Sequence, residues 1–232
     1  MGIAAIVGSN GGIGRALASA VEASGDFSRV LRISRQQDAD IRMDLADEDS
    51  IADAAAHIGA MADNLSLCIV ATGLLHDGDT GPEKTLRSLD PEWMMQNYRV
   101  NTVGPAMVAK HFLPVMPRKT AYHFAVLSAR VGSISDNRLG GWHSYRASKA
   151  ALNMVIRNLA IEIGRSNSAA IITGLHPGTV DTGLSAPFQA NVAEGKLFTA
   201  EYSASRMLKL LLQLTPADSG KIFAWDGAEI AP

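Results

Sequence analysis

The chain has 232 residues, of which 47% are hydrophobic and 19% are charged, and its formal net charge is -2. This composition supplies ample apolar material for one domain spanning 1–232, and it lacks the basic excess that nucleic acids and anionic membranes attract. No apolar run reaches the roughly 18 residues that a membrane helix needs. We therefore expect neither nucleic acid nor a membrane as a partner.

Cysteine and histidine are placed in ways that favour neither a disulfide nor a metal site. The single cysteine, Cys68, lies in an apolar run, cannot form an internal disulfide and is interpreted as a buried thiol. The six histidines show no spacing with cysteines or carboxylates that is typical of metal ligands. No basic leader precedes the first apolar run. The sequence therefore predicts a cytoplasmic protein without a metal site.

The first predicted elements form a phosphate-binding turn. A buried strand at 3–7 is followed by Gly8-Ser9-Asn10-Gly11-Gly12-Ile13-Gly14 and then by a helix-forming segment at 15–21. Glycines let backbone N–H groups approach a pyrophosphate, and the positive end of the helix dipole faces it. A glycine-rich turn alone is more often only a turn, but the flanking strand and helix favour dinucleotide binding. The predicted cofactor residues in this turn are Gly8, Asn10, Gly12, Ile13 and Gly14.

Strand-like and helix-like runs alternate along the rest of the chain. Such alternation is typical of right-handed βαβ units, so it predicts an α/β fold: a doubly wound Rossmann-type parallel sheet of about seven strands with helices on both faces. Asp90-Pro91 starts one helix, with Asp as N-cap and Pro at the first helical position, and this helix extends to about Val115. The further strands are predicted at 29–33, 41–43, 66–71, 121–127, 169–175 and 220–224.

A tyrosine and a lysine lie four residues apart in Tyr145-Arg146-Ala147-Ser148-Lys149, a stretch that is predicted to be helical. Side chains at positions i and i+4 share one helical face. A free tyrosine has a pKa of about 10, so it exchanges protons poorly at neutral pH unless a nearby cation stabilises its phenolate. Lys149 can supply that cation, although the pair taken alone is also compatible with an exposed helical face.

The glycine turn and the tyrosine–lysine pair, with Ser128 lying 17 residues before Tyr145, resemble the motifs of the short-chain dehydrogenase/reductase family. The resemblance covers essentially the whole chain and implies the strand order 3-2-1-4-5-6-7. It identifies Ser128, Tyr145 and Lys149 as the catalytic set and Asn101 as the family's helix asparagine. The segments 140–149 and 223–227 look most like the C-factor and sniffer-type carbonyl reductase branch.

The resemblance also implies further residues at the cofactor. Gly73 matches the end of the family's Asn-Asn-Ala-Gly stretch, which here reads Val70-Ala71-Thr72-Gly73, so the asparagine amides that brace the central strands are absent. Asp44 and Leu45 match an adenine-contacting pair, although Asp44 could merely begin the turn into the next helix. The nicotinamide end is expected at Pro177, Gly178, Val180 and Thr182.

The end of the second strand indicates which dinucleotide binds. In sheets of this kind an acidic residue there holds the ribose hydroxyls of NAD, whereas a cation accommodates the 2′-phosphate of NADP. The sequence has Ser34 and Arg35 at this place and no acid. We therefore predict NADP, with NAD as the less favoured cofactor. The alternative is that Arg35 is a solvated loop residue paired with Asp38 or Asp40.

The predicted chemistry is the NADPH-dependent reduction of an aldehyde, ketone or quinone. The carbonyl oxygen gains negative charge as hydride arrives, so it needs hydrogen-bond donors and a proton. Tyr145 supplies the proton, Ser128 polarises the carbonyl, and Lys149 lowers the tyrosine pKa and holds the nicotinamide ribose. By resemblance, Asn101 distorts its helix and fixes a water that relays protons to Lys149.

Two other functions remain open. One is a dinucleotide-binding regulatory or signalling protein with little turnover, for which the tyrosine proton would have no use. The other is a hydrolase built on Ser128 and His143, which lacks a Gly-x-Ser-x-Gly turn around the serine.

Two further expectations concern the surface. Trp142 and His143 either line the substrate pocket or pack into the core, and the segment 182–198 is either a mobile lid or a static loop. The segments 94–115 and 147–163 match the helices that commonly pair between subunits of the family. We therefore expect a homodimer or homotetramer, unless these apolar side chains are satisfied within one subunit.

Overall fold

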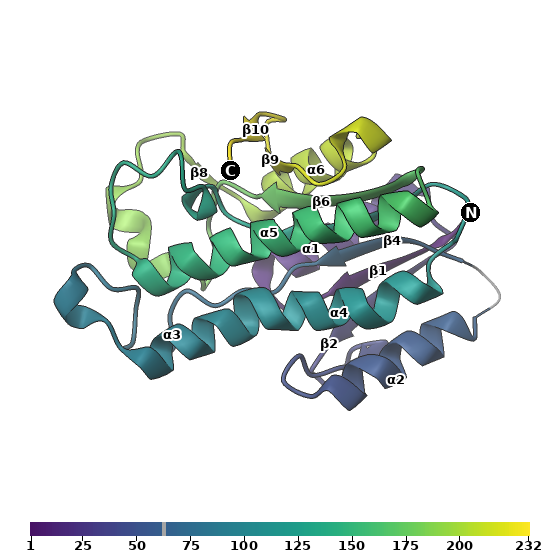
Figure 1. The fold of residues 1–232 in the computed structure, drawn as a ribbon, viewed down its shortest axis with the longest axis horizontal. Coiled ribbons are helices and arrows are strands. Elements are labelled where there is room, and N and C mark those ends of the chain that lie inside the picture. The colour runs from purple at the N-terminus through teal and green to yellow at the C-terminus, as the bar shows by residue number, and fades with distance from the viewer. Residues whose placement is uncertain (62–63) are drawn as a thin grey trace.

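A mainly parallel sheet with helices on both faces forms the centre of the computed structural model, which describes residues 1–61 and 64–232 (Figure 1). Its eight strands lie in the order β10-β9-β6-β5-β4-β1-β2-β3, and only the β9–β10 pair is antiparallel. The strands are β1 (Ile3–Val7), β2 (Arg29–Ser34), β3 (Ile41–Arg42), β4 (Leu65–Val70), β5 (Tyr122–Leu127), β6 (Ala170–His176), β9 (Ile222–Ala224) and β10 (Glu229–Ile230).

All seven predicted strands are present, and their order is the predicted 3-2-1-4-5-6-7, so both expectations are confirmed. β10 is an additional edge strand that no pattern indicated. Every residue of β1 is buried, as are five of the six residues of β4. Strands that are covered on both faces read as continuous apolar runs, which is why these two were found from sequence.

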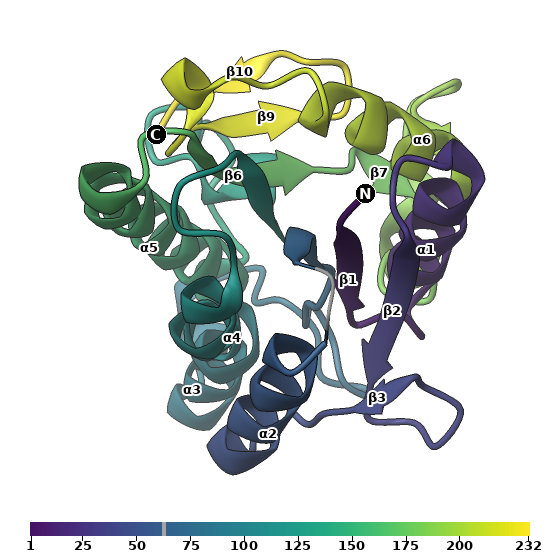
Figure 2. The ribbon, with the colours of Figure 1, turned by 90° about the vertical axis from the view of Figure 1, so that its right-hand side faces the viewer.

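The two faces of the sheet are covered by different helices (Figure 2). α1 (Gly12–Ser24) and α6 (Ala200–Leu211) pack on one face, where Leu17 and Met207 belong to the same apolar cluster. α2 (Glu48–Gly59), α4 (Gly104–Phe112) and α5 (His143–Ser166) pack on the other. α5 is the longest helix described, and it carries the predicted tyrosine–lysine pair across the sheet.

The helix predicted to start at Asp90-Pro91 is present and changes its winding along its length. α3 (Pro91–Tyr98) is followed by the π-helical turn η2 (Arg99–Val103), by α4 and by the 3-10 turn η3 (Leu113–Val115). Asp90 caps it by accepting a hydrogen bond from the Trp93 N–H at 2.7 Å, as predicted. Asn101 lies inside the π turn, so the distortion that the resemblance implies is observed.

The two ends of the segment 182–198 lie side by side. Its flanks form a separate pair of parallel strands, β7 (Thr179–Val180) and β8 (Leu197–Phe198), and the 3-10 helix η5 (Ala186–Asn191) lies between them. The remaining short helices are η1 (Leu86–Ser88), η4 (Arg130–Gly132) and η6 (Pro216–Asp218). None of the helices in the described part of the chain is long and apolar enough to cross a membrane.

Candidate active site

The carboxyl ends of four neighbouring strands bring the predicted site residues to one edge of the sheet. Gly8 follows β1, Gly73 lies shortly after β4, Ser128 follows β5 and Pro177 follows β6. Since these strands are parallel and adjacent, their ends meet at a single edge. α5 crosses the end of β5 and adds Tyr145 and Lys149 to this group.

Tyr145 and Lys149 lie together on the buried face of α5. The Lys149 Nζ is 5.9 Å from the centroid of the Tyr145 ring and donates a hydrogen bond to the Leu127 carbonyl oxygen at 2.8 Å. The exposed fractions are 2% for Lys149 and 8% for Tyr145. The alternative of an exposed helical face is therefore wrong for this pair.

Burial dominates the pKa values of both groups. It raises the pKa of Tyr145 to about 12 and lowers the pKa of Lys149 to about 7. The expected lowering of the tyrosine pKa by Lys149 stays a prediction, and in this structure the net shift of that pKa is upward. The reason is that desolvation destabilises the phenolate, while Lys149 is itself desolvated and only partly charged near pH 7. Tyr145 consequently holds its proton at neutral pH, in the form that a proton donor requires.

Asn101 connects the π turn to the loop after β4 and to α5. Its Oδ1 accepts from the Leu74 N–H at 2.8 Å, and its Nδ2 donates to the Leu74 carbonyl at 2.9 Å and to the Ser148 Oγ at 3.1 Å. A Cβ at Gly73 would lie 3.7 Å from the Asn101 Oδ1 and 3.9 Å from the Lys149 Nζ. The glycine therefore keeps the space between these two polar groups open.

Ser128 is oriented by a residue that the sequence analysis missed. Its Oγ donates to the Asn153 Oδ1 at 2.6 Å, and Ser128 is buried. Asn153 lies four residues after Lys149 on α5 and so shares one helical face with Tyr145 and Lys149. This helical spacing is the signal that could have found it.

Apolar and aromatic side chains surround the Tyr145 ring. Trp142 lies at 6.2 Å from it and Phe188 at 5.2 Å from Trp142, measured between ring centroids, and Leu75 packs in the same cluster. Trp142 packs against the apolar cluster that contains Tyr145, and His143 is the first residue of α5. That these two residues line a substrate pocket stays a prediction. Phe188 belongs to η5, so the segment 182–198 packs over the catalytic residues.

The glycine turn leaves room that side chains would fill. Gly8 has a φ of +82°, and a Cβ there would lie 2.8 Å from the Thr72 Cγ2. A Cβ at Gly12 would lie 2.6 Å from the Thr182 Cγ2, and one at Gly14 would overlap the Gly8 carbonyl oxygen. Only glycines permit this close approach of β1, α1 and the segment after β6.

The N-terminus of α1 is open, in contrast to those of neighbouring helices. Asp47, Asp90 and Thr199 cap α2, α3 and α6 with their side chains. Gly11, the N-cap of α1, offers no side-chain acceptor, and the first turn of α1 contains no acidic residue. The first N–H groups of a helix need acceptors from elsewhere, and a phosphate group is a suitable one. This end of α1, which includes Ile13, therefore fits the pyrophosphate of a dinucleotide.

Arg35 is available at the end of β2. It is exposed, and it forms no ion pair with residues 1–61 or 64–232. The carboxylate of Asp40 instead accepts from the Arg32 N–H at 2.8 Å. Ser34, beside Arg35, accepts from the Gln36 N–H at 3.1 Å. The alternative pairing of Arg35 with an aspartate is therefore absent from this part of the chain.

Asp44 and Leu45 lie between β3 and α2. The Asp44 Oδ1 accepts from the Ala46 N–H at 3.0 Å, so this residue does form the turn into the next helix that was its alternative role. Leu45 lies against the start of α4, where a Cβ on Gly104 would be 3.4 Å from the Leu45 Cβ. Their expected contact with adenine stays a prediction.

The segment after β6 is held beside the glycine turn. The Pro177 carbonyl accepts from the Ser203 Oγ at 2.7 Å, and Gly178 has a φ of +80°. Val180 is buried in β7, and Thr182 contacts the Gly12 position. The contact of these residues with the nicotinamide end stays a prediction.

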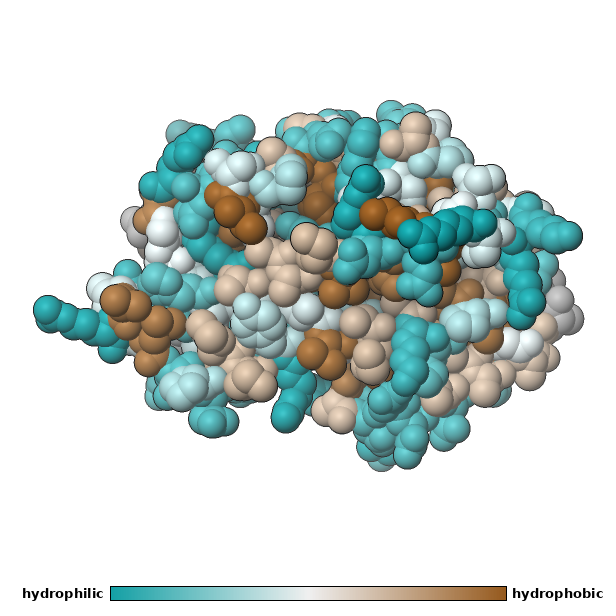
Figure 3. Space-filling view, viewed as in Figure 1, coloured by the Kyte–Doolittle hydropathy of each residue, from teal (hydrophilic) through white to brown (hydrophobic). Residues whose placement is uncertain are grey.

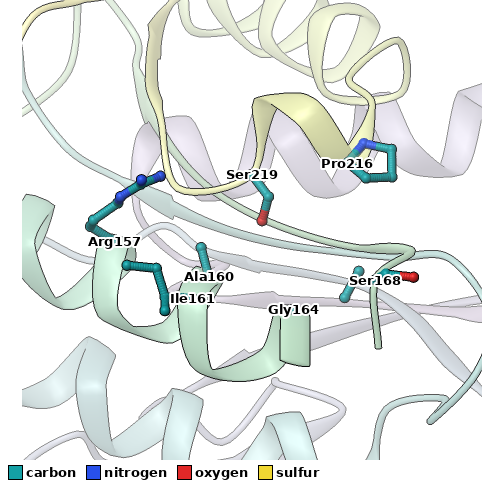
Figure 4. A pocket seen from close by; sticks show the side chains of 8 residues that line it. Arg157, Ala160, Ile161, Gly164, Ser168, Pro216 and Ser219 are labelled. Carbon is teal, nitrogen blue, oxygen red and sulfur yellow. The ribbon is translucent and has the colours of Figure 1, made fainter. Parts of the chain in front are cut away.

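A separate recess lies at the far end of α5 (Figure 4). It has a volume of about 210 Å³, and its walls include Arg157, Ala160, Gly164, Pro216 and Ser219. It contains none of the predicted site residues. Among the described residues, no group of three or more His, Cys, Asp or Glu side chains could hold a metal ion.

Comparison with known proteins agrees with this geometry. Residues 2–193 match the family model described as short chain dehydrogenase. The chain is 29% identical to the C-signal of Myxococcus xanthus over 171 residues, which cover 74% of this chain and 98% of that protein. It is also 29% identical to a 1-hydroxy-2-glutathionyl-2-methyl-3-butene dehydrogenase from Rhodococcus over 185 residues, covering 80% of this chain and 76% of that one.

Solved structures resemble the fold over its full length. An NADPH-bound carbonyl reductase from chicken fatty liver has a TM-score of 0.85 and 25% identity, covering 100% of this chain and 98% of the other. The carbonyl reductase Sniffer of D. melanogaster has a TM-score of 0.82 and 20% identity, covering 100% and 99%. The predicted resemblance to the C-factor and sniffer-type branch is thereby confirmed.

We predict that Lys149→Met changes how folding stability depends on pH. The ordinary lysine pKa of 10.5 falls to about 7 in the folded protein, so between these values the unfolded chain binds a proton that the native state does not. Wild-type stability should therefore rise with pH across this window. The methionine variant lacks this dependence, so its advantage over the wild type should be largest at about pH 6 and shrink towards about pH 10.

Urea unfolding at a series of pH values measures this difference. Lys209→Met is a suitable control, because it removes a lysine that is exposed on α6. A Lys149→Met difference that stays constant from about pH 6 to about pH 10 would contradict the assigned pKa.

Proposed function

Because the chain belongs to the short-chain dehydrogenase family and is an NAD(P)-dependent oxidoreductase, we propose that it reduces the carbonyl of an aldehyde, ketone or quinone with NADPH. The observation that carries this proposal is the buried pair of Tyr145 and Lys149 at the same edge of the sheet as an open helix N-terminus. A protonated phenol next to a dinucleotide cradle is the arrangement that carbonyl reduction needs.

The residues that would hold the cofactor are distributed over the ends of five strands (β1, β2, β3, β4 and β6) and the helix α5. The glycine turn from Gly8 to Gly14 would bind the pyrophosphate, Arg35 and Ser34 the 2′-phosphate, and Asp44, Leu45 and Gly73 the adenosine side. Lys149, Tyr145 and the segment from Pro177 to Thr182 would hold the nicotinamide riboside. When bound, NADPH supplies the hydride.

Proton transfer is assigned to the buried tyrosine. Hydride addition places negative charge on the carbonyl oxygen, and Tyr145, protonated at neutral pH, donates its proton there. Ser128 would donate its hydroxyl hydrogen to the same oxygen once substrate is bound, in place of the Asn153 Oδ1 that accepts it in this structure. The space beside Gly73, between Asn101 and Lys149, would admit the water that returns a proton to the site.

The surroundings of Tyr145 favour an uncharged, apolar substrate. Trp142, Phe188, Leu75 and Leu184 pack around or near the phenol ring. An aromatic or apolar carbonyl compound would bury surface against them, whereas a charged one would lose hydration without a partner. Phe188 would have to move for such a substrate to reach Tyr145, so the segment 182–198 is assigned the role of a lid.

A regulatory protein is the second candidate, because the chain is similar to the C-signal of M. xanthus. Such a protein would keep the dinucleotide and need no turnover. Cofactor oxidation with a panel of aldehydes, ketones and quinones separates the two functions. We also propose a cytoplasmic location, in keeping with a single cysteine that remains a free thiol.

Tyr145→Phe tests the catalytic assignment. The variant should bind NADPH as the wild type does and lose turnover by roughly 10² to 10⁴-fold, the usual contribution of a positioned acid or base. Stopped-flow measurement of a single hydride transfer checks this, with NADPH fluorescence as the control for binding. An unchanged transfer rate in the variant would remove Tyr145 from the mechanism.

Arg35→Ala tests the choice of cofactor. A charge-assisted bond to phosphate contributes about 1.5 to 3 kcal/mol, and each 1.4 kcal/mol is about tenfold in affinity. The variant should therefore bind NADPH roughly 10 to 150-fold more weakly and NADH almost as before. Titration of both cofactors measures this.

Arg32→Ala is the matched control, because Arg32 lies in β2 and pairs with Glu22 at 2.9 Å. It should leave the preference for NADPH unchanged. Equal losses of NADPH and NADH affinity in Arg35→Ala would make Arg35 structural, and a wild-type preference for NADH would exclude NADP as the cofactor.

The face formed by α3, α4 and α5 supports a homodimer or homotetramer. Met95, Val103, Met154 and Ile161 are exposed on it, and a groove of about 670 Å³ runs between α4 and α5. Pale and brown residues gather over these helices in the space-filling view (Figure 3). Exposed apolar side chains that gather on one face are typical of protein interfaces.

Light scattering should therefore return the mass of a dimer or tetramer at micromolar concentration. Met154→Glu should shift the protein towards monomers, because it buries a charge in the proposed interface. Leu212→Glu, placed at the end of α6 on the opposite face of the sheet, should not. A single species of monomer mass in the wild type would refute the assembly.

A further inference from the structure

The helix that carries the catalytic residues begins in an unusual way. Its N-cap, Trp142, provides no side-chain hydrogen bond and has a φ of +50°. Trp142 is the one non-glycine residue with a positive φ in residues 1–61 and 64–232, and it follows Gly140 and Gly141, which are also left-handed. This conformation is strained for a bulky side chain and persists only where surrounding contacts enforce it.

Glu83, from the loop after β4, supplies those contacts. Its carbonyl oxygen accepts from the Trp142 N–H at 2.5 Å. Its carboxylate accepts from the Ser144 N–H at 3.1 Å and from the Ser144 Oγ. Glu83 is 4% exposed, Ser144 is fully buried, and within the described parts of the chain the carboxylate has no ion-pair partner. The N-terminal end of α5 is therefore the counter-charge that favours this buried carboxylate.

We propose that Glu83 is a positioning residue for the reaction, a role that rests on the proposed function. It fixes the backbone on both sides of His143, and Tyr145 follows Ser144 directly. Trp142, whose ring lies 6.2 Å from that of Tyr145, is set by the same contacts. One loop carboxylate thus fixes the direction of the phenol and the aromatic wall beside it.

Loss of this carboxylate acts locally. The Ser144 N–H and hydroxyl would be left buried without an acceptor, and the left-handed turn at Trp142 would relax. The first turn of α5 would then fray, while the rest of the 24-residue helix stays packed against the sheet. Tyr145 would move with the frayed turn, and a displacement of about 1 Å at a reacting group can cost about 10²-fold in rate.

Glu83→Ala should lower kcat by roughly 10 to 100-fold and leave the Kd for NADPH within about twofold of the wild type. The split is expected because the glycine turn and Arg35 are remote from this loop in the chain, and the hydrogen bonds of Glu83 in the described residues go to Trp142 and Ser144. Glu83→Gln should restore most of kcat. Its amide oxygen can accept from the Ser144 N–H, and its amide nitrogen can donate to the Ser144 Oγ.

Asp218→Ala is a matched control. The Asp218 carboxylate accepts from the Thr215 N–H at 3.0 Å and from the Thr215 Oγ1 at 2.8 Å, which is the same pair of donor types. It lies in η6, in the wall that also lines the recess at the far end of α5. This variant should lower the melting temperature and leave kcat unchanged. A Glu83→Ala protein with wild-type kcat per folded molecule would overturn the proposal.

Amide hydrogen exchange across 142–148 separates this inference from the proposed function. Glu83→Ala should accelerate exchange there and not at 155–163, whereas Glu83→Gln should resemble the wild type. Unchanged exchange at 142–148 would overturn the positioning role, even if no carbonyl substrate is turned over. Full turnover by Tyr145→Phe would remove the catalytic assignment, and the exchange data would still show whether Glu83 orders the turn.

Discussion

The burial of Lys149 is the constraint on which the rest of the site depends. A buried amine is costly, and the fall of its pKa to about 7 expresses that cost. The Leu127 carbonyl and the face of the Tyr145 ring partly compensate it. The residue Lys149 also packs closely against η4, since a Cβ on Gly132 would lie 2.8 Å from the Lys149 Cβ. The packing around the buried Lys149 side chain therefore fixes how closely α5, β5 and η4 approach one another.

The parts of the structure that sequence could predict are those set by local chemistry. Alternating buried strands and helices predicted the parallel sheet, whereas its strand order came from the family resemblance, and Asp90-Pro91 predicted a helix start. The π turn at Asn101 was accessible only through family resemblance, because it depends on hydrogen bonds to Leu74, 27 residues away. The role of Glu83 was not predicted from sequence, because its partner Ser144 lies 61 residues further along the chain. The direction in which the Tyr145 pKa shifts could also be assigned only from the observed burial of its side chain.

The helix N-termini divide into those that the chain satisfies itself and one that it does not. In the first group, α2, α3 and α6 are each capped by the residue that precedes them, which is Asp47, Asp90 or Thr199. The N-terminus of α5 is capped by Glu83, which lies far away in the sequence. α1 alone among these keeps its N–H groups free of side-chain acceptors. The uncapped N–H groups of α1 therefore need an acceptor from elsewhere, and an anionic group of a bound molecule would be a suitable one.

The two borders of the sheet have a consequence for association. β3 and β10 are each two residues long, while β1, β4, β5 and β6 between them are apolar and nearly continuous. An exposed strand recruits further strands through its unpaired N–H and C=O groups, and so short a border offers very few of them. Edge-to-edge growth, and the aggregation that follows from it, is thereby discouraged. Side chains on the helices remain as the surface for contacts with other molecules, and the shape of that surface can select the partner.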